Sequence, residues 1–154
     1  MLNRKGLMQA MVAAWTAKIF WLSTEAFSSD RTLSLLSHLL GLTGLILTNR
    51  AISVLHLLIR KAAHIVEYSV LAVLLCLLWN EGGSESLQPK IAGKVMVVCA
   101  GYALLDELHQ YFVQGRGPSL ADCGLDILGA LMSVWMFQIA APLFPVSAER
   151  KSAL

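Results

Sequence analysis

The chain has 154 residues, of which 56% are hydrophobic and only 14% are charged, and its mean hydropathy is +0.64. Soluble domains carry about 25% charged residues, so this composition favours a polytopic membrane protein with a single domain. The formal net charge of +2 is small and the basic residues are scattered, which argues against a nucleic-acid partner. The three cysteines form no CxxC pair, so we predict neither a disulfide framework nor a redox motif.

A helix needs about 20 apolar residues to cross roughly 30 Å of hydrocarbon. Four segments meet or approach this length, and we predict an all-α bundle whose transmembrane spans are residues 7–23, 62–79, 91–108 and 125–144. The first span follows a basic start like that of a signal peptide, but no small-residue cleavage site comes after it, which favours a retained helix. The polar tail, residues 145–154, is expected to fray.

Residues 31–59 separate the first two spans and are apolar but interrupted. Their longest uncharged run would be a helix of about 27 Å, which is marginal for a crossing. We predict two short interfacial or re-entrant helices here, with a fifth span as the alternative. Basic residues divide almost equally between the two sides of the bundle, so the charge distribution does not fix the orientation. No pattern indicates the oligomeric state.

Polar residues gather where the second span begins, the third ends and the fourth begins. Because consecutive spans are antiparallel, these three ends lie at one membrane surface. The polar residues recur at helical spacing, and a carboxylate at membrane depth is costly unless it is paired, so the polar faces should meet. We predict a polar ligand-binding pocket from these residues: Lys61, His64, Glu67, Tyr68, Asp106, Glu107, His109, Gln110, Arg116, Ser119, Asp122 and Asp126. Gly115-Arg116-Gly117-Pro118 predicts a tight turn beside it.

Several arrangements are conceivable within this pocket. We expect ion pairs between a cation, Lys61 or Arg116, and a carboxylate, Asp106, Glu107 or Asp122. The side chains of His64 and His109 are expected to be hydrogen-bonded between these pairs. The sets His64-x-x-Glu67 and Asp106-x-x-His109 resemble the carboxylate–histidine sets of bundle metal sites. However, there is no HExxH motif and no Cys/His cluster, so we predict no metal and no cofactor.

Two strings, RKAAHIVEY at 60–68 and DELHQYFVQGRGPSLAD at 106–122, resemble the VanZ-like family of small bacterial membrane proteins. The stretch WLSTEAFSS, at 21–29, is similar to the serine-containing segment that follows the first helix of that family. The resemblance covers about residues 15–137 and includes Gly129. Two positions depart from it, because Asp126 stands where the family is expected to have Asn and Gln114 where a proline is usual.

The resemblance implies a multi-pass protein of the bacterial cytoplasmic membrane that modulates susceptibility to glycopeptide and other lipid-bearing antibiotics. It implies no established reaction. The favoured hypothesis is that the pocket binds a membrane lipid headgroup or a lipid-linked envelope precursor through Arg116 and Lys61, on the extracytoplasmic side by analogy. One alternative is a membrane-embedded enzyme with Asp106, Glu107 and His109 as acid, base or metal ligands. Another is a structural bundle whose polar residues fix helix register.

Overall fold

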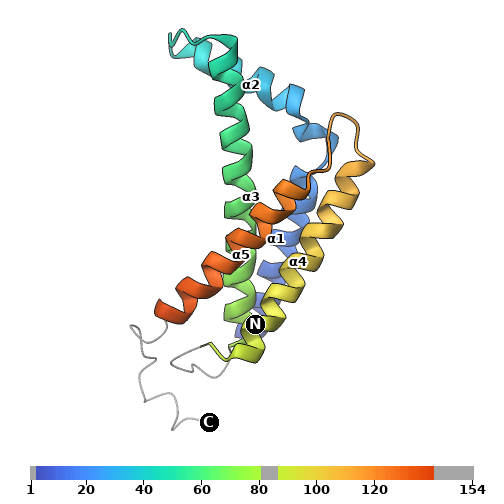
Figure 1. Ribbon diagram of the computed structural model, residues 1–154. Coiled ribbons are helices and arrows are strands. Elements are labelled where there is room, and N and C mark those ends of the chain that lie inside the picture. The colour runs from blue at the N-terminus through green and yellow to red at the C-terminus, as the bar shows by residue number, and fades with distance from the viewer. Residues whose placement is uncertain (1–2, 81–86, 141–154) are drawn as a thin grey trace.

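The computed structural model describes residues 3–80 and 87–140, and within these ranges it contains helices and no strand (Figure 1). The elements in chain order are α1 (Arg4–Leu22), the short 3-10 helix η1 (Glu25–Phe27), α2 (Ser29–Leu42), α3 (Asn49–Trp79), α4 (Pro89–Tyr111) and α5 (Leu120–Ala140). The all-α prediction is therefore confirmed. The end of the fourth predicted span, residues 141–144, and the tail at 145–154 lie outside the described residues.

Among the described helices, α3 and α5 are long and apolar enough to cross a membrane. The other two helices of comparable length carry charged residues inside their apolar stretches, Lys18 in α1 and Lys94 with Asp106 and Glu107 in α4. A four-span arrangement therefore stays a prediction, although a helix occupies each predicted span.

The longest helix, α3, begins at Asn49 and not at residue 62 as expected from the sequence. The Thr48 side chain accepts a hydrogen bond from the backbone N–H of Ala51 at 3.2 Å and so caps the helix. Neither glycine nor proline follows before Trp79, so nothing in this stretch breaks the helix. Of the two short helices predicted for residues 31–59, α2 is one. The other is continuous with the span.

The N-terminal third of α3 lies outside the helical core. Every buried residue of α3 falls between His64 and Leu78, and Figure 1 shows the upper part of α3 projecting beyond α1, α4 and α5 with α2 beside it. A helix of 31 residues is about 46 Å long, which exceeds the roughly 30 Å of a hydrocarbon layer. A crossing by α3 therefore leaves one end of it outside that layer.

The core forms where α1, α3, α4 and α5 meet. Its fully buried members are mostly small or aliphatic, together with one tyrosine: Ile19, Tyr68, Leu71, Ala72, Cys76, Val95, Cys99, Ala103 and Ala130. Small residues let the helix backbones approach closely. In a lipid bilayer the hydrophobic effect does not drive helices together, so such close packing is a main source of their association.

Helices α3 and α5 cross in close contact at Gly129. A Cβ atom at this position would collide with the backbone carbonyl of Ile65, so only glycine fits. The Ser69 hydroxyl donates a hydrogen bond of 3.0 Å to the Gly129 carbonyl at the same crossing. Because Asp126 precedes Gly129 by about one turn and His64 adjoins Ile65, this crossing brings the two ionisable side chains together.

A tight turn is present between α4 and α5, but it lies two residues earlier than predicted, where the Arg116 N–H donates a hydrogen bond of 3.2 Å to the Val113 carbonyl. Gly115 has φ of +72°, in the left-handed region that favours glycine. A Cβ atom there would come within 3.1 Å of the Ser28 Cβ, and the Gly115 carbonyl accepts a hydrogen bond of 3.4 Å from the Ser29 N–H. The turn therefore packs against the segment that joins α1 to α2.

Substitution of Gly115 should loosen this contact. We expect Gly115→Val to destabilise the protein by about 2 kcal/mol, because a left-handed backbone is unfavourable for a branched residue and the side chain would press on Ser28. The measurement is the midpoint of thermal unfolding in detergent, followed by helical circular dichroism. Gly117→Val is the matched control, since a Cβ there meets nothing within 4 Å. Equal midpoints for the two variants would contradict the expectation.

Candidate functional site

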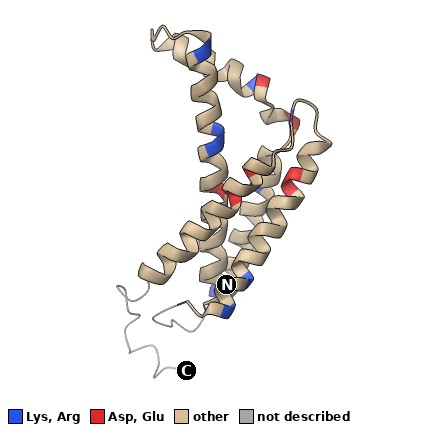
Figure 2. Cartoon of the chain, in the orientation of Figure 1, with Lys and Arg blue, Asp and Glu red and all other residues tan. Residues whose placement is uncertain are grey.

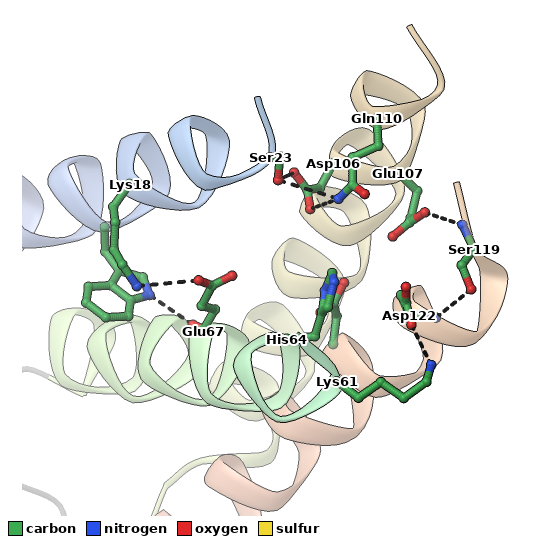
Figure 3. Close-up of polar contacts among 12 residues, drawn as sticks. Lys18, Ser23, Lys61, His64, Glu67, Asp106, Glu107, Gln110, Ser119 and Asp122 are labelled. Carbon is green, nitrogen blue, oxygen red and sulfur yellow. Dashed lines mark hydrogen bonds and ion pairs between the residues drawn. The ribbon is translucent and has the colours of Figure 1, made fainter. Parts of the chain in front are cut away.

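The polar residues of α3, α4 and α5 come together at one level of the bundle, and the end of α1 joins them. Figure 2 shows acidic residues on all three helices near the place where α5 crosses α3. The close-up in Figure 3 shows that the side chains form several separate contacts and not one continuous network.

Two contacts link α3 to α5. The Lys61 ammonium lies 2.9 Å from an Asp122 carboxylate oxygen, which confirms one of the expected ion pairs. The His64 Nδ1 lies 3.0 Å from Asp126 Oδ1, and both of these side chains are buried. Two polar residues about one turn apart in α3, Lys61 and His64, therefore contact two residues one turn apart in α5, Asp122 and Asp126.

Asp106 connects α4 to the end of α1. Its carboxylate accepts hydrogen bonds from the Ser23 hydroxyl at 2.6 Å and from the Gln110 amide at 3.0 Å, and all three side chains are buried. Asp106 was one of three carboxylates considered as partners of Lys61 or Arg116, and Lys61 is paired with another of them, Asp122. Ser23 directly follows the last residue of α1, and this position places its hydroxyl within hydrogen-bonding distance of Asp106. The serine-rich stretch at 21–29 was the only signal in the sequence for this contact.

Glu67 turns toward α1 and away from His64. Its carboxylate lies 3.5 Å from the Lys18 ammonium, and its backbone carbonyl accepts a hydrogen bond of 2.9 Å from the Trp15 indole N–H. Neither α1 residue was among the predicted site residues. A lysine inside an apolar helix needs a partner at that depth, and this is the signal that could have revealed it.

Glu107, from α4, and Ser119 together cap the N-terminus of α5. The Ser119 N–H donates a 2.5 Å hydrogen bond to Glu107 Oε2, and the Ser119 hydroxyl accepts one of 3.3 Å from the Asp122 N–H. A serine side chain and a carboxylate are both favourable at a helix N-terminus. Ser119 therefore caps a helix. The other oxygen of Glu107, Oε1, is buried and has no hydrogen-bond partner in the described part of the chain.

Arg116 caps the other end of α1. Its guanidinium donates a hydrogen bond to the carbonyl of Leu22, the last residue of that helix, where a positive charge is favourable. We expected a carboxylate partner instead. Burial lowers the pKa of the Arg116 guanidinium, and the nearby positive charge of Arg60 lowers it further.

His109 and Tyr68 do not join the hydrogen-bonded contacts. The His109 ring stacks on Phe20 with the ring centroids 4.2 Å apart, and its buried Nδ1 has no hydrogen-bond partner among the described residues. The Tyr68 hydroxyl is likewise buried without such a partner. The placing of His109 between the ion pairs was therefore wrong.

The proposed catalytic trio is not assembled. Asp106 contacts Ser23, Glu107 contacts Ser119, and His109 stacks on an aromatic ring, so the three side chains face three different neighbours. The four-residue metal set considered from the sequence is separated for the same reason. A different set does converge: His64, Glu107 and Asp126 each place one potential ligand atom within 4.8 Å of the others.

A cavity of about 310 Å³ lies next to the polar residues, between the end of α1, α2 and the N-terminal half of α3. Leu35, Leu39 and Ile59 contribute to its apolar wall. Its polar lining includes Ser23, Arg60 and Glu67, and the Arg60 guanidinium also donates a hydrogen bond to the Ser29 hydroxyl. No pattern in the sequence indicated this cavity, because it forms only where α2 packs beside α3.

Comparison with known proteins gives one match. A family model described as VanZ/LLP1 matches residues 8–141, whereas no curated protein and no solved structure matches the chain. The match and the two candidate spans indicate a membrane protein, and membership is consistent with an envelope protein linked to antibiotic resistance. The matched range covers most of the chain and contains every residue of the site, so the chain belongs to the VanZ/LLP1 family.

Proposed function

We propose that this protein is a multi-pass protein of the bacterial cytoplasmic membrane that binds an anionic lipid headgroup or lipid-linked envelope precursor. By holding such a lipid it modulates susceptibility to glycopeptide and other lipid-bearing antibiotics. The observation that carries the proposal is the cavity between α2 and α3, which combines an apolar wall with the Arg60 guanidinium.

The size and lining of the cavity suit part of a lipid chain. Small-molecule sites range from roughly 300 to 1,000 Å³, so a cavity of about 310 Å³ takes a segment of an acyl or isoprenoid chain and not a whole lipid. Leu35, Leu39 and Ile59 are also half exposed at its rim. The remainder of the chain can therefore follow this apolar surface into the bilayer.

The charges near the cavity favour an anionic headgroup. Among the described residues no carboxylate forms an ion pair with Arg60, whose hydrogen-bond partner is the neutral hydroxyl of Ser29. Glu67 also lines the cavity, but Lys18 balances its charge. Arg60 is near enough to lower the pKa of Arg116, so an anion bound at Arg60 would relieve the repulsion between the two guanidinium groups. Guanidinium groups bind phosphate with two parallel hydrogen bonds.

Arg60 therefore replaces the cations first favoured from the sequence as the main headgroup ligand. Lys61 is already paired with Asp122, and Arg116 with the carbonyl of Leu22. These two residues would support the site by holding α5 and the turn before it in place. Both would strengthen binding without direct contact.

The test is lipid retention by the full chain in mild detergent, measured by native mass spectrometry after incubation with phosphatidylglycerol or phosphatidylcholine. We expect Arg60→Gln to weaken phosphatidylglycerol binding about tenfold, because one charged hydrogen-bonding contact is worth roughly 1.5–3 kcal/mol. Arg50→Gln, at the exposed start of the same helix, should bind like the wild type. Equal loss in both variants, or equal binding of both lipids by the wild type, would count against the proposal.

The apolar part of the cavity can be tested with a second matched pair. Ala63 lines the cavity and its neighbour Ala62 does not, although both are exposed residues of α3. Ala63→Phe should fill the cavity and reduce lipid retention, whereas Ala62→Phe should leave it unchanged. If Ala63→Phe retained lipid as well as Ala62→Phe does, the bound chain would not occupy this cavity.

A further inference from the structure

We propose that the chain binds one divalent transition-metal ion between α3, α4 and α5, with His64, Glu107 and Asp126 as the ligands. This goes beyond the lipid-binding function and does not depend on it, since none of the three residues lines the lipid cavity. It also departs from the expectation drawn from the sequence, which was that the pocket holds no metal.

The geometry of the three side chains is suitable. One potential ligand atom from each lies within 4.8 Å of the other two. Metal–ligand bonds of about 2.1 Å place the ligand atoms of a tetrahedral site roughly 3.4 Å apart, so closing around an ion needs only small side-chain rotations. His64, Glu107 and Asp126 are 8%, 6% and 0% exposed, so an ion here would be shielded from solvent.

Two carboxylate oxygens of this group are available as ligand atoms. Glu107 Oε1 and Asp126 Oδ2 are both buried without any hydrogen-bond partner among the described residues. Buried carboxylate oxygens are normally paired, because each one left without a partner is costly. The second oxygen of Glu107 is already held in place by the Ser119 N–H, and an outer contact of this kind orients a ligand toward a metal. The second oxygen of Asp126 contacts His64, itself one of the three ligands, so this contact keeps the two side chains next to each other.

The charges of the group also favour a divalent ion. Two carboxylates face a single imidazole here, and Lys61, about one turn before His64 in α3, is paired with Asp122. An ion of charge +2 with a neutral His64 makes the group neutral, which is the least costly state for buried charges. An imidazole with carboxylates suits Zn²⁺, Mn²⁺ or Fe²⁺, whereas Ca²⁺ and Mg²⁺ prefer oxygen ligands alone.

A competing explanation is that Glu107 and Asp126 share a proton, as closely spaced carboxylates can. That arrangement would also leave oxygen atoms without other partners. The two explanations differ in one measurable respect, because a proton-sharing pair binds no ion stoichiometrically.

The test uses the full chain, purified with any affinity tag removed, stripped with chelator and then given Zn²⁺ or Mn²⁺ alone. We expect about one equivalent of ion by elemental mass spectrometry and a higher thermal midpoint with the ion bound. Asp126→Asn and Glu107→Gln, which keep side-chain size, should each lower the affinity by at least about tenfold. Glu67→Gln, which removes a carboxylate of α3 that is not a ligand, is the control and should bind the ion like the wild type.

Measurements on the wild-type protein test the proposed ion site even if the variants fail to fold. X-ray absorption of the bound ion should show one imidazole with oxygen ligands and no sulfur, which separates this site from binding at the three buried cysteines. Less than a tenth of an equivalent bound, a sulfur-containing shell, or unchanged affinity in Asp126→Asn would each overturn the proposal. Arg60→Gln should keep the ion, and Asp126→Asn should keep phosphatidylglycerol, so failure of one proposal is distinct from failure of the other.

Discussion

Gly129→Val should prevent α5 from packing on α3 and should give the largest loss of stability of any substitution considered. A side chain at this position meets the backbone of Ile65, which cannot rotate aside as a side chain could. The helices must then separate, which breaks the hydrogen bond of Ser69 to the Gly129 carbonyl and the contact of His64 with Asp126. We expect destabilisation of about 3 kcal/mol or more, near the upper end for an overpacked core.

The measurement is thermal unfolding in detergent together with the yield of monodisperse protein. Gly124→Val is the matched control, because Gly124 lies on the exposed side of the same helix and a Cβ there meets nothing within 4 Å. Both variants add the same branched residue to α5, so their difference reports the helix crossing and not helix propensity. A Gly129→Val protein as stable as Gly124→Val would show that the crossing is not required.

Asp106→Ala should release the end of α1 from α4. The Ser23 hydroxyl and the Gln110 amide are both buried and would lose their acceptor. Leaving a buried donor unsatisfied costs about 1–3 kcal/mol, so we expect a total loss of about 3 kcal/mol. Because Ser23 also lines the cavity between α2 and α3, we expect phosphatidylglycerol retention to fall in the same variant.

Two further variants make this result specific. Asp106→Asn keeps an acceptor for Ser23, so it should recover most of the stability that Asp106→Ala loses. Asp30→Ala, which removes an exposed carboxylate in the first turn of α2, should be close to neutral. If Asp106→Asn were as unstable as Asp106→Ala, the negative charge of Asp106 and not its hydrogen bonds would be the stabilising feature.

The two substitutions act on different parts of one assembly. Gly129 sets the distance between α3 and α5, and with it the geometry of His64, Glu107 and Asp126. Asp106 fixes the end of α1, where the cavity between α2 and α3 begins. We therefore expect Gly129→Val to impair ion binding more than lipid retention. Asp106→Ala should have the opposite effect.

The sequence alone was enough to predict the all-α fold, the family and the convergence of polar residues. Hydrophobic runs of the length of a membrane span impose helices, and antiparallel succession places the ends of neighbouring helices on one side. The positions of His64, Asp106 and Asp126 along their helices therefore carried real information about which residues would be neighbours. These inferences depend only on the order and spacing of residues along the chain.

The individual partners were decided only by the tertiary structure. A carboxylate bonds to whichever donor the rotation and lateral shift of its helix bring within reach, and neither quantity is encoded locally. Asp106 thus meets Ser23 and Arg116 meets the carbonyl of Leu22, where the sequence suggested other pairs. Glu67 meets Lys18, for which the sequence suggested no partner. The close approach of α5 to α3 at Gly129, and the cavity formed by α2, arise from packing between distant segments. Local sequence patterns describe single helices, so they could not reveal either feature.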